Sequence, residues 1–369
     1  MKNKLFDRYR LIDSESVTTP NILAYPDSME TNICRALQQV SNPTCLRPHI
    51  KTVKCAPIVQ LYLNAGVTKF KCATLKEAEL LAAVGVPDLL IAYPLLGPNV
   101  AGFMDLILRF PETRFQVTVD SLQGMTVLNH AAAKKNLSIP VFIDINLGMN
   151  RTGINIEDLE DFGLDVSAFA NITLVGIHGY DGHIRERDLG QRERIVQHTF
   201  GKVLKNIKHL EERTGIKLTM VFGGSNTFPI YARYPFVECS PGTFILWDYG
   251  YHMTLPEQHF DFGALIIARI ISRPAPNIIC IDLGYKAIAS ENELVYRLHV
   301  LDYPDWKPIS QSEEHLLFEI PEQDSAHIFV GQLLYIVPYH ICPTVAMYPA
   351  FQVVKAGVLS GQWSIQPRY

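Results

Sequence analysis

The sequence predicts an α/β fold in which a TIM (β/α)8 barrel over residues 26–255 is joined to an antiparallel β-domain of residues 1–25 and 256–369. Short apolar runs rich in β-branched and aromatic residues alternate with helical patterns, which favours a barrel. The alternative, a doubly wound sheet, usually carries G-x-G-x-x-G at its first βα turn, and this chain has no such sequence. Beyond residue 255 turns separate strand-like runs, which indicates antiparallel β-structure.

The barrel is expected to open with a helix over residues 29–40, for which Ser28 is a candidate N-cap. Several of the strand-like runs that follow are apolar throughout, as is typical of strands covered on both faces. The eight barrel strands are expected near residues 45–50, 69–73, 88–93, 115–120, 140–146, 173–178, 218–223 and 237–239.

The β-domain is expected to contain five strand-like runs from the second half of the chain and one from its beginning. The run at 22–25 is expected to join this domain because it precedes the barrel. The other strands are expected at residues 264–271, 278–282, 294–300, 315–320 and 333–337.

Composition indicates a soluble globular protein. Hydrophobic residues make up 48% and charged residues 19% of the 369 positions, and the net charge of −4 gives no reason to expect nucleic acid or an anionic membrane as a partner. The basic N-terminus is followed by no apolar segment, and the longest apolar run, 262–271, is broken by Arg269 and too short to span a bilayer. The seven cysteines contain no C-x-x-C pair, so we expect reduced thiols and a cytoplasmic location.

Polar residues gather where the predicted strands end, which is where a barrel places its active site. Lys51 follows the first strand, the sequence 146–153 follows the fifth and the sequence 178–183 follows the sixth. The glycine-containing sequences 223–227 and 240–243 follow the last two strands. This clustering at one end predicts an enzyme.

Lys51 is the candidate nucleophile. A lysine ammonium loses its proton readily when it is desolvated or placed beside other cations, and Arg47 and Lys54 are close in sequence. The alternative interpretation is a solvated basic loop that caps a strand.

The sequences 223–227 and 240–243 are candidates for a phosphate cradle, because glycines let backbone amides approach an anion and barrels often bind phosphate after strands seven and eight. The alternative is an ordinary βα turn with a Ser or Asn cap.

His340 and Cys342 are candidate metal ligands. On an extended strand, positions i and i+2 point to the same side, and the nitrogen–sulfur pair suits Zn²⁺. The alternative is a buried cysteine beside a structural histidine.

Several sequence elements together resemble the D-threonine aldolase and D-serine dehydratase family, whose members are pyridoxal-phosphate (PLP) enzymes of the alanine-racemase-like barrel type. The resemblance runs from about residue 18 to the end and is carried by the sequences 47–54, 148–153, 176–183, 282–287, 312–315 and 338–345. One departure is Val53, where the family often has histidine.

The resemblance implies roles for individual residues. Lys51 would hold PLP covalently, and His183 is a candidate general base for a substrate hydroxyl. A divalent metal, Zn²⁺ in the first place and Mn²⁺ as the alternative, would bind His340 and Cys342. The remaining cofactor-binding residues would be His49, Arg151, His178, Tyr180, Gly224, Ser225, Asn226, Thr227, Gly242 and Thr243.

The function implied is a metal-assisted lyase that acts on D-3-hydroxy amino acids, by elimination as in D-serine dehydratases or by retro-aldol cleavage as in D-threonine aldolases. Cysteine at position 342 resembles the dehydratases, whereas the aldolases more often have aspartate there. The alternatives are a PLP-dependent amino acid racemase and a non-catalytic PLP-binding protein. A homodimer is expected by analogy with related barrels.

Overall fold

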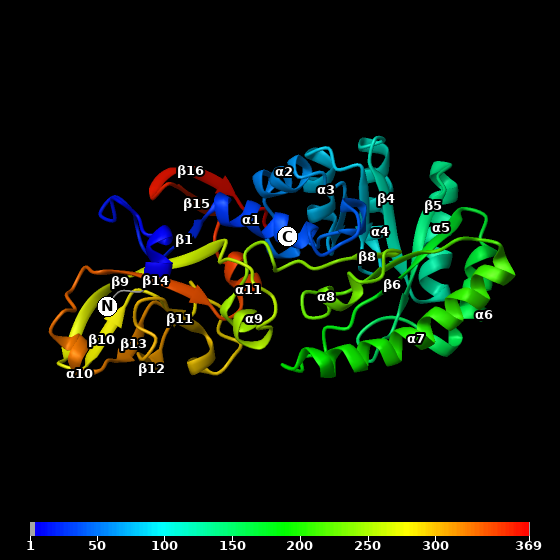
Figure 1. Ribbon diagram of the computed structural model, residues 1–369. Coiled ribbons are helices and arrows are strands. Elements are labelled where there is room, and N and C mark those ends of the chain that lie inside the picture. Colours follow the sequence, from blue (N-terminus) through cyan, green and yellow to red (C-terminus); the bar gives the residue numbers. More distant parts are fainter. Residues whose placement is uncertain (1–3, 369) are drawn as a thin grey trace. The chain divides into compact units, whose positions relative to one another are not determined.

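The structure is a computed structural model that describes residues 4–368 (Figure 1). The chain forms two compact units. One comprises the chain up to Ile33 together with Thr243–Pro367, and the other comprises Cys34–Gly242 together with the C-terminal end. The domain boundaries predicted from the sequence, after residues 25 and 255, stay a prediction.

The second unit is a barrel-like β/α domain, as predicted. Its parallel strands lie side by side in chain order, and within this unit a helix follows each strand except the last. The strands are β2 (Lys69–Cys72), β3 (Asp88–Ile91), β4 (Arg114–Val119), β5 (Ile139–Ile145), β6 (Ile172–Gly179), β7 (Thr219–Phe222) and β8 (Val237–Cys239). The helices are α2 (Ala56–Asn64), α3 (Leu75–Ala83), α4 (Pro98–Arg109), α5 (Leu122–Lys135), α6 (Leu159–Ser167), α7 (Leu189–Thr214) and α8 (Phe228–Tyr231).

The first predicted strand, 45–50, is not a regular strand. Its ends form the 3-10 turns η2 (Pro43–Cys45) and η3 (Ile50–Thr52), and only single parallel bridges join Leu46 to Cys239 and His49 to Lys71. Pro48 explains the difference, because it has no N–H for a ladder; its carbonyl accepts from Lys71 N at 2.9 Å. These bridges nevertheless connect the segment to both edge strands of the sheet, β8 and β2, so they close the barrel.

Side chains fill the barrel interior. Leu90, Phe142 and Val221, from three different strands, form a fully buried cluster at its centre. Arg47 is also buried, and its guanidinium donates to Glu238 Oε2 at 2.7 Å and to Asp88 Oδ1 at 2.5 Å. Asp88 is the first residue of β3, so this ion network lies toward the amino-terminal ends of the strands. The interior is therefore a packed core.

The other unit is a mostly antiparallel β-domain, as predicted. Its main sheet has the order β12-β13-β10-β9-β1-β15-β16, and β14 pairs with both β9 and β11. As expected, the first strand of the chain joins it, because β1 pairs antiparallel with β9 and parallel with β15. The strands are β1 (Asn21–Ala24), β9 (Ala264–Ala275), β10 (Ile278–Ile281), β11 (Leu298–Val300), β12 (Lys307–Gln311), β13 (Leu316–Glu319), β14 (Leu333–Pro338), β15 (Ala350–Lys355) and β16 (Val358–Ser364).

Three further expectations need correction. Helix α1 spans Pro26–Leu37, so it begins at a proline, which is well suited to a first helical turn, and Ser28 lies inside it. The predicted strand 294–300 is a 3-10 turn, η5 (Leu294–Tyr296), followed by the short β11. Strands β12, β15 and β16 were not predicted. The remaining elements are η1 (Lys4–Tyr9), α9 (Tyr249–Thr254), α10 (Glu322–Ser325) and α11 (Ile341–Val345), with η4 (Ile156–Asp158) in the barrel. Over residues 4–368, no helix combines the length and apolarity that crossing a membrane requires.

Candidate active site

Three cations converge on the ring of Tyr180, the residue that follows β6. The distances to the ring centroid are 5.8 Å from Lys51 Nζ, 5.9 Å from Lys71 Nζ and 5.1 Å from Arg151 Cζ. These residues come from η3, from β2 and from the loop after β5. In the part of the chain that the structure describes, none of the three forms an ion pair with a carboxylate. The carboxyl ends of the barrel strands therefore bring three cations to one aromatic ring.

Lys71 was missed by the sequence interpretation, and it is the most buried of these cations, with 2% of its surface exposed. Its Nζ donates to Ser240 Oγ and lies 3.3 Å from His178 Nε2. Burial first, and then the charge of Lys51, lower the pKa of Lys71 to about 7. The available signal was that Lys69 and Lys71 lie on one face of an otherwise apolar run.

His178 links Lys71 to a carboxylate. Its Nδ1 lies 2.7 Å from Asp144 Oδ1, near the end of β5. Burial and the nearby Lys71 lower the pKa of His178, although Asp144 opposes them. We therefore assign a neutral imidazole whose Nδ1–H donates to Asp144 and whose Nε2 accepts from Lys71. Burial alone would raise the pKa of Asp144, but His178 and Thr152 bring it below its ordinary value.

Lys51 lies on the turn that follows the irregular first strand, and its side chain is exposed. His49 Nδ1 accepts from its backbone amide at 3.3 Å, and Lys54 Nζ donates to its carbonyl at 2.9 Å. Burial and the charges of Lys51 and Lys71 hold the pKa of His49 well below its ordinary value. Arg47, expected among the cations around Lys51, instead belongs to the ion network described above.

Two of the predicted glycines permit close packing. A Cβ on Gly224 would lie 2.7 Å from Cε2 of the Tyr180 ring, and a Cβ on Gly242 would lie 2.8 Å from the carbonyl oxygen of His49. Gly223 has φ +76°, a conformation that favours glycine. The turns after β7 and β8 therefore approach Tyr180 and His49 closely because they carry no side chain at these points.

The side chains of the predicted phosphate loop hold the neighbouring turn. Asn226 Nδ2 donates to the carbonyls of Asp181 and Ile184, and Thr227 Oγ1 donates to Asp181 Oδ1 at 2.7 Å. Ser225 is buried. Helix α8, which follows the loop, has only one turn, so the expected helix dipole adds little to anion binding here.

Two further predicted residues, His183 and Thr243, have other neighbours. His183 is exposed, and a Cβ on Gly148 would lie 3.0 Å from its Nε2. Thr243 belongs to the β-domain unit, where its Oγ1 lies 3.6 Å from Cys342 Sγ.

The predicted metal ligands do not lie on a strand, because β14 ends at Pro338 and His340 is the N-cap of α11. Their side chains are nevertheless neighbours, since the imidazole of His340 is hydrogen-bonded to Cys342. His340 Nδ1 is also paired with Glu291 Oε1, which the sequence interpretation did not single out. Burial opposes protonation, but Cys342 and Glu291 raise the pKa of His340 to about 9. Among the residues described, no group of three or more His, Cys, Asp or Glu side chains is arranged to hold a metal ion.

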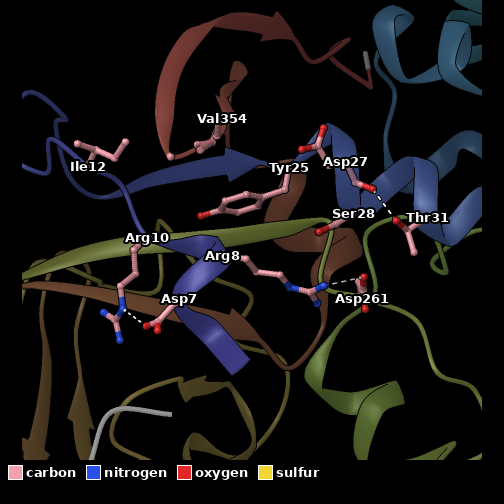
Figure 2. Close-up of a pocket in the computed structure, with 12 residues that line it drawn as sticks. Asp7, Arg8, Arg10, Ile12, Tyr25, Asp27, Ser28, Thr31, Asp261 and Val354 are labelled. Atoms are coloured by element: carbon pink, nitrogen blue, oxygen red, sulfur yellow. Dashed lines mark hydrogen bonds and ion pairs between the residues drawn. The ribbon is translucent and has the colours of Figure 1, made fainter. Parts of the chain in front are cut away.

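A cavity of about 420 Å³ lies in the β-domain unit, and the two arginines that line it already have carboxylate partners (Figure 2). Arg8 is paired with Asp261 at 2.9 Å, and Arg10 is paired with Asp302 at 2.6 Å and with Asp7. None of the predicted site residues lines it. The three cations around the Tyr180 ring, and not this cavity, mark the candidate site.

A parallel β/α barrel with a lysine-containing site at its carboxyl end, combined with an antiparallel β-domain, defines an alanine-racemase-like protein. The profile of the alanine racemase N-terminal domain matches residues 26–249, and that of the putative serine dehydratase domain matches residues 263–354. The chain belongs to this alanine-racemase-like group and, within it, to the D-threonine aldolase and D-serine dehydratase family.

Characterised proteins with these names are similar over almost their full length. A D-threonine aldolase from Arthrobacter sp is 23% identical over 95% of this chain and 93% of its own. A 3-hydroxy-D-aspartate aldolase from Paracoccus denitrificans (strain Pd 1222) is 25% identical over 97% and 94%, respectively. A D-threo-3-hydroxyaspartate dehydratase from Delftia sp. (strain HT23) is 23% identical over 92% and 95%. The crystal structure of D-threonine aldolase from Filomicrobium marinum shares the fold, with a TM-score of 0.86 and 24% identity over 95% of each chain.

Proposed function

We propose that this chain is a PLP-dependent lyase that acts on D-3-hydroxy amino acids with the help of a divalent metal ion. The observation that carries the proposal is the convergence of three cations, one of them Lys51, on the ring of Tyr180. An anionic cofactor suits cations that form no ion pair with a carboxylate in the described residues, and Lys51 offers an exposed primary amine. The family, and relatives named as aldolases and as a dehydratase, support the class of reaction.

The residues fit PLP in their chemistry. Lys51 Nζ is the amine that would hold its aldehyde carbon, and Arg151 would balance part of its negative charge. The bare backbone of Gly224 and Gly242 leaves the turns after β7 and β8 free of side chains at their closest contacts. When bound, PLP supplies the electron sink that stabilises negative charge at the substrate Cα.

The chain's own groups would then handle the protons. Lys51 Nζ, as a free amine, would take the proton from the substrate Cα. Neutral His178 is fixed in one tautomer by Asp144, so it keeps Nε2 as an acceptor beside Lys71. His183 is the candidate that takes the proton of the substrate hydroxyl.

His340 and Cys342 fit a divalent metal through their donor atoms. Glu291 pairs with His340 Nδ1, which leaves Nε2 as the metal-binding atom, and carboxylates commonly orient metal-binding histidines in this way. The thiolate of Cys342 favours Zn²⁺ over harder cations. A bound metal would supply a Lewis acid for the β-hydroxyl of the substrate.

Two outcomes are open to this set of residues. If Lys51 removes the Cα proton and the hydroxyl leaves, the substrate becomes a 2-oxo acid and ammonia after hydrolysis. If a base removes the hydroxyl proton instead, the Cα–Cβ bond breaks to give glycine and an aldehyde. Cys342 favours the first outcome, because the family resemblance associates cysteine at this position with the dehydratases.

Product analysis tests the proposal. The purified protein, with PLP and Zn²⁺ or Mn²⁺, is incubated with D-serine, D-threonine and D-3-hydroxyaspartate. A 2-oxo acid with ammonia identifies a dehydratase, and glycine with an aldehyde identifies an aldolase. Lys51→Arg keeps the positive charge but replaces the amine with a guanidinium, which cannot take up a proton. It should abolish both products. Turnover by His340→Ala at the full rate without added metal would contradict the metal assignment.

The alternatives predict other results. A racemase would convert D-alanine or D-serine into a racemic mixture, which chiral analysis detects, without a requirement for metal. A non-catalytic protein would bind PLP, with the visible absorbance of the lysine adduct, and turn over none of these amino acids. The expected homodimer stays a prediction that light scattering of the PLP-loaded protein can test.

A further inference from the structure

Lys71 has no role in the proposed reaction, yet it is a cation buried inside the barrel. Burying a lysine ammonium is costly unless a carboxylate or another anion accompanies it. Lys69, two residues earlier on the same face of β2, shows the usual solution, since its Nζ is paired with Glu238. Lys71 forms no such ion pair in the described residues and instead lies near two other cations.

The surroundings of Lys71 orient its ammonium group, and the carboxylates of Asp144 and Asp181 raise its pKa without forming an ion pair with it. Ser240 Oγ and neutral His178 Nε2 accept from Nζ, and Asp144 holds the imidazole from its other side. An ammonium group has three N–H donors, so one remains after these two hydrogen bonds. The Nζ atom lies 5.9 Å from the centroid of the Tyr180 ring, which Lys51 and Arg151 also approach. A positively charged donor that is held in place and has no carboxylate within ion-pair distance is the arrangement expected of an anion-binding residue.

We propose that Lys71 is a further cofactor-binding residue, whose ammonium group donates to an anionic oxygen of PLP. This inference rests on the proposed function and names a residue that the sequence motifs do not include. The oxygen belongs either to the phosphate or to the phenolate of the pyridine ring, because both are oxyanions that an ammonium can bind. Asp144 and Asp181 attract the Lys71 ammonium from beyond ion-pair distance, and bound PLP would supply an anionic partner that Lys71 can contact directly.

Binding of cofactor analogues separates this role from a structural one. Fluorescence titrations with 4′-deoxypyridoxine 5′-phosphate measure binding without the covalent link to Lys51, since this compound has no aldehyde. Lys71→Met removes the charge and keeps the length of the side chain. Lys69→Met is the matched control, because it removes a lysine from the same strand and face that already has a carboxylate partner. Circular dichroism and thermal unfolding show that both variants fold.

Lys71→Met is expected to weaken binding of the analogue about tenfold or more, as loss of a charge-assisted hydrogen bond does, while Lys69→Met stays within about twofold of the wild type. 4′-Deoxypyridoxine, which lacks both the phosphate and the aldehyde, then locates the contact: equal weakening of its binding assigns the phenolate oxygen, and unchanged binding assigns the phosphate. Wild-type affinity in folded Lys71→Met would overturn the inference and leave the proposed function intact. If the wild type itself binds neither compound, the proposed function fails.

Discussion

Replacing Lys71 by methionine should stabilise the cofactor-free protein, and the gain should depend on pH. The pKa of this group falls from an ordinary value of 10.5 to about 7 on folding. At about 1.4 kcal/mol for each unit of pKa difference, the buried ammonium lowers the free energy of unfolding by about 5 kcal/mol below pH 7. Loss of the hydrogen bonds to Ser240 and His178 offsets about 2–3 kcal/mol of this in the variant. We expect a net gain of about 2 kcal/mol near pH 7.

The sign of the pH dependence follows from the number of protons bound. Between pH 7 and pH 10.5 the unfolded wild type keeps the Lys71 proton and the folded protein releases it, so the contribution of this group to stability rises with pH. The variant lacks the group. Its advantage should therefore shrink as the pH rises and disappear, or reverse, by about pH 10.

Urea unfolding of the cofactor-free proteins, followed by circular dichroism at several pH values from 6.5 to 10, measures the difference. The Lys69→Met variant serves as control, because its lysine is ion-paired and its effect should keep the same sign over this range. A difference between Lys71→Met and wild type that does not change with pH would refute the reasoning, since it would mean that Lys71 keeps its proton when folded.

Three further predictions concern other parts of the chain. Arg47→Met should lower the free energy of unfolding by about 3 kcal/mol, because it leaves the buried Glu238 and the partly buried Asp88 without their shared cation; urea unfolding tests this, and a loss below about 1 kcal/mol would contradict it. Glu291→Gln should weaken Zn²⁺ binding about 10–100-fold by releasing His340; competition with a fluorescent chelator measures this, and unchanged affinity would exclude the orienting role. Gly224→Ala should displace the Tyr180 ring and reduce PLP affinity without unfolding the barrel; absorbance titration tests it, and wild-type affinity would show that the ring moves at no cost to binding.

The alternation of strands and helices could be predicted because each element of the barrel carries its own local pattern. The runs at 69–73 and 88–93 are apolar and short, and the structure has β2 and β3 there. The irregular first strand differs because a single residue, Pro48, removes a hydrogen-bond donor. In the β-domain, β12 and β16 are mostly exposed and polar, so no apolar run indicated them.

The candidate site was predicted in part for the same reason. Residues in loops after the strands, such as Lys51 and Arg151, can be assigned to the carboxyl end of a barrel from strand positions alone, and the structure brings both to the ring of Tyr180. Lys71 lies inside a strand. Whether a strand residue faces the barrel interior near the site or the covering helices depends on register and tilt, which a single run does not reveal.

By itself, the sequence determined the two-part α/β architecture, the family and the loop residues that belong to the carboxyl ends of the strands, because local hydrophobic patterns and short motifs carry that information. The tertiary structure decided which charges are neutralised and which are not. It pairs Arg47 and Lys69 with carboxylates, brings Glu291 to His340 across 49 positions of the chain, and leaves Lys71 buried beside Lys51 and Arg151. Pairing of charges depends on contacts between distant segments, and only the folded chain establishes those contacts.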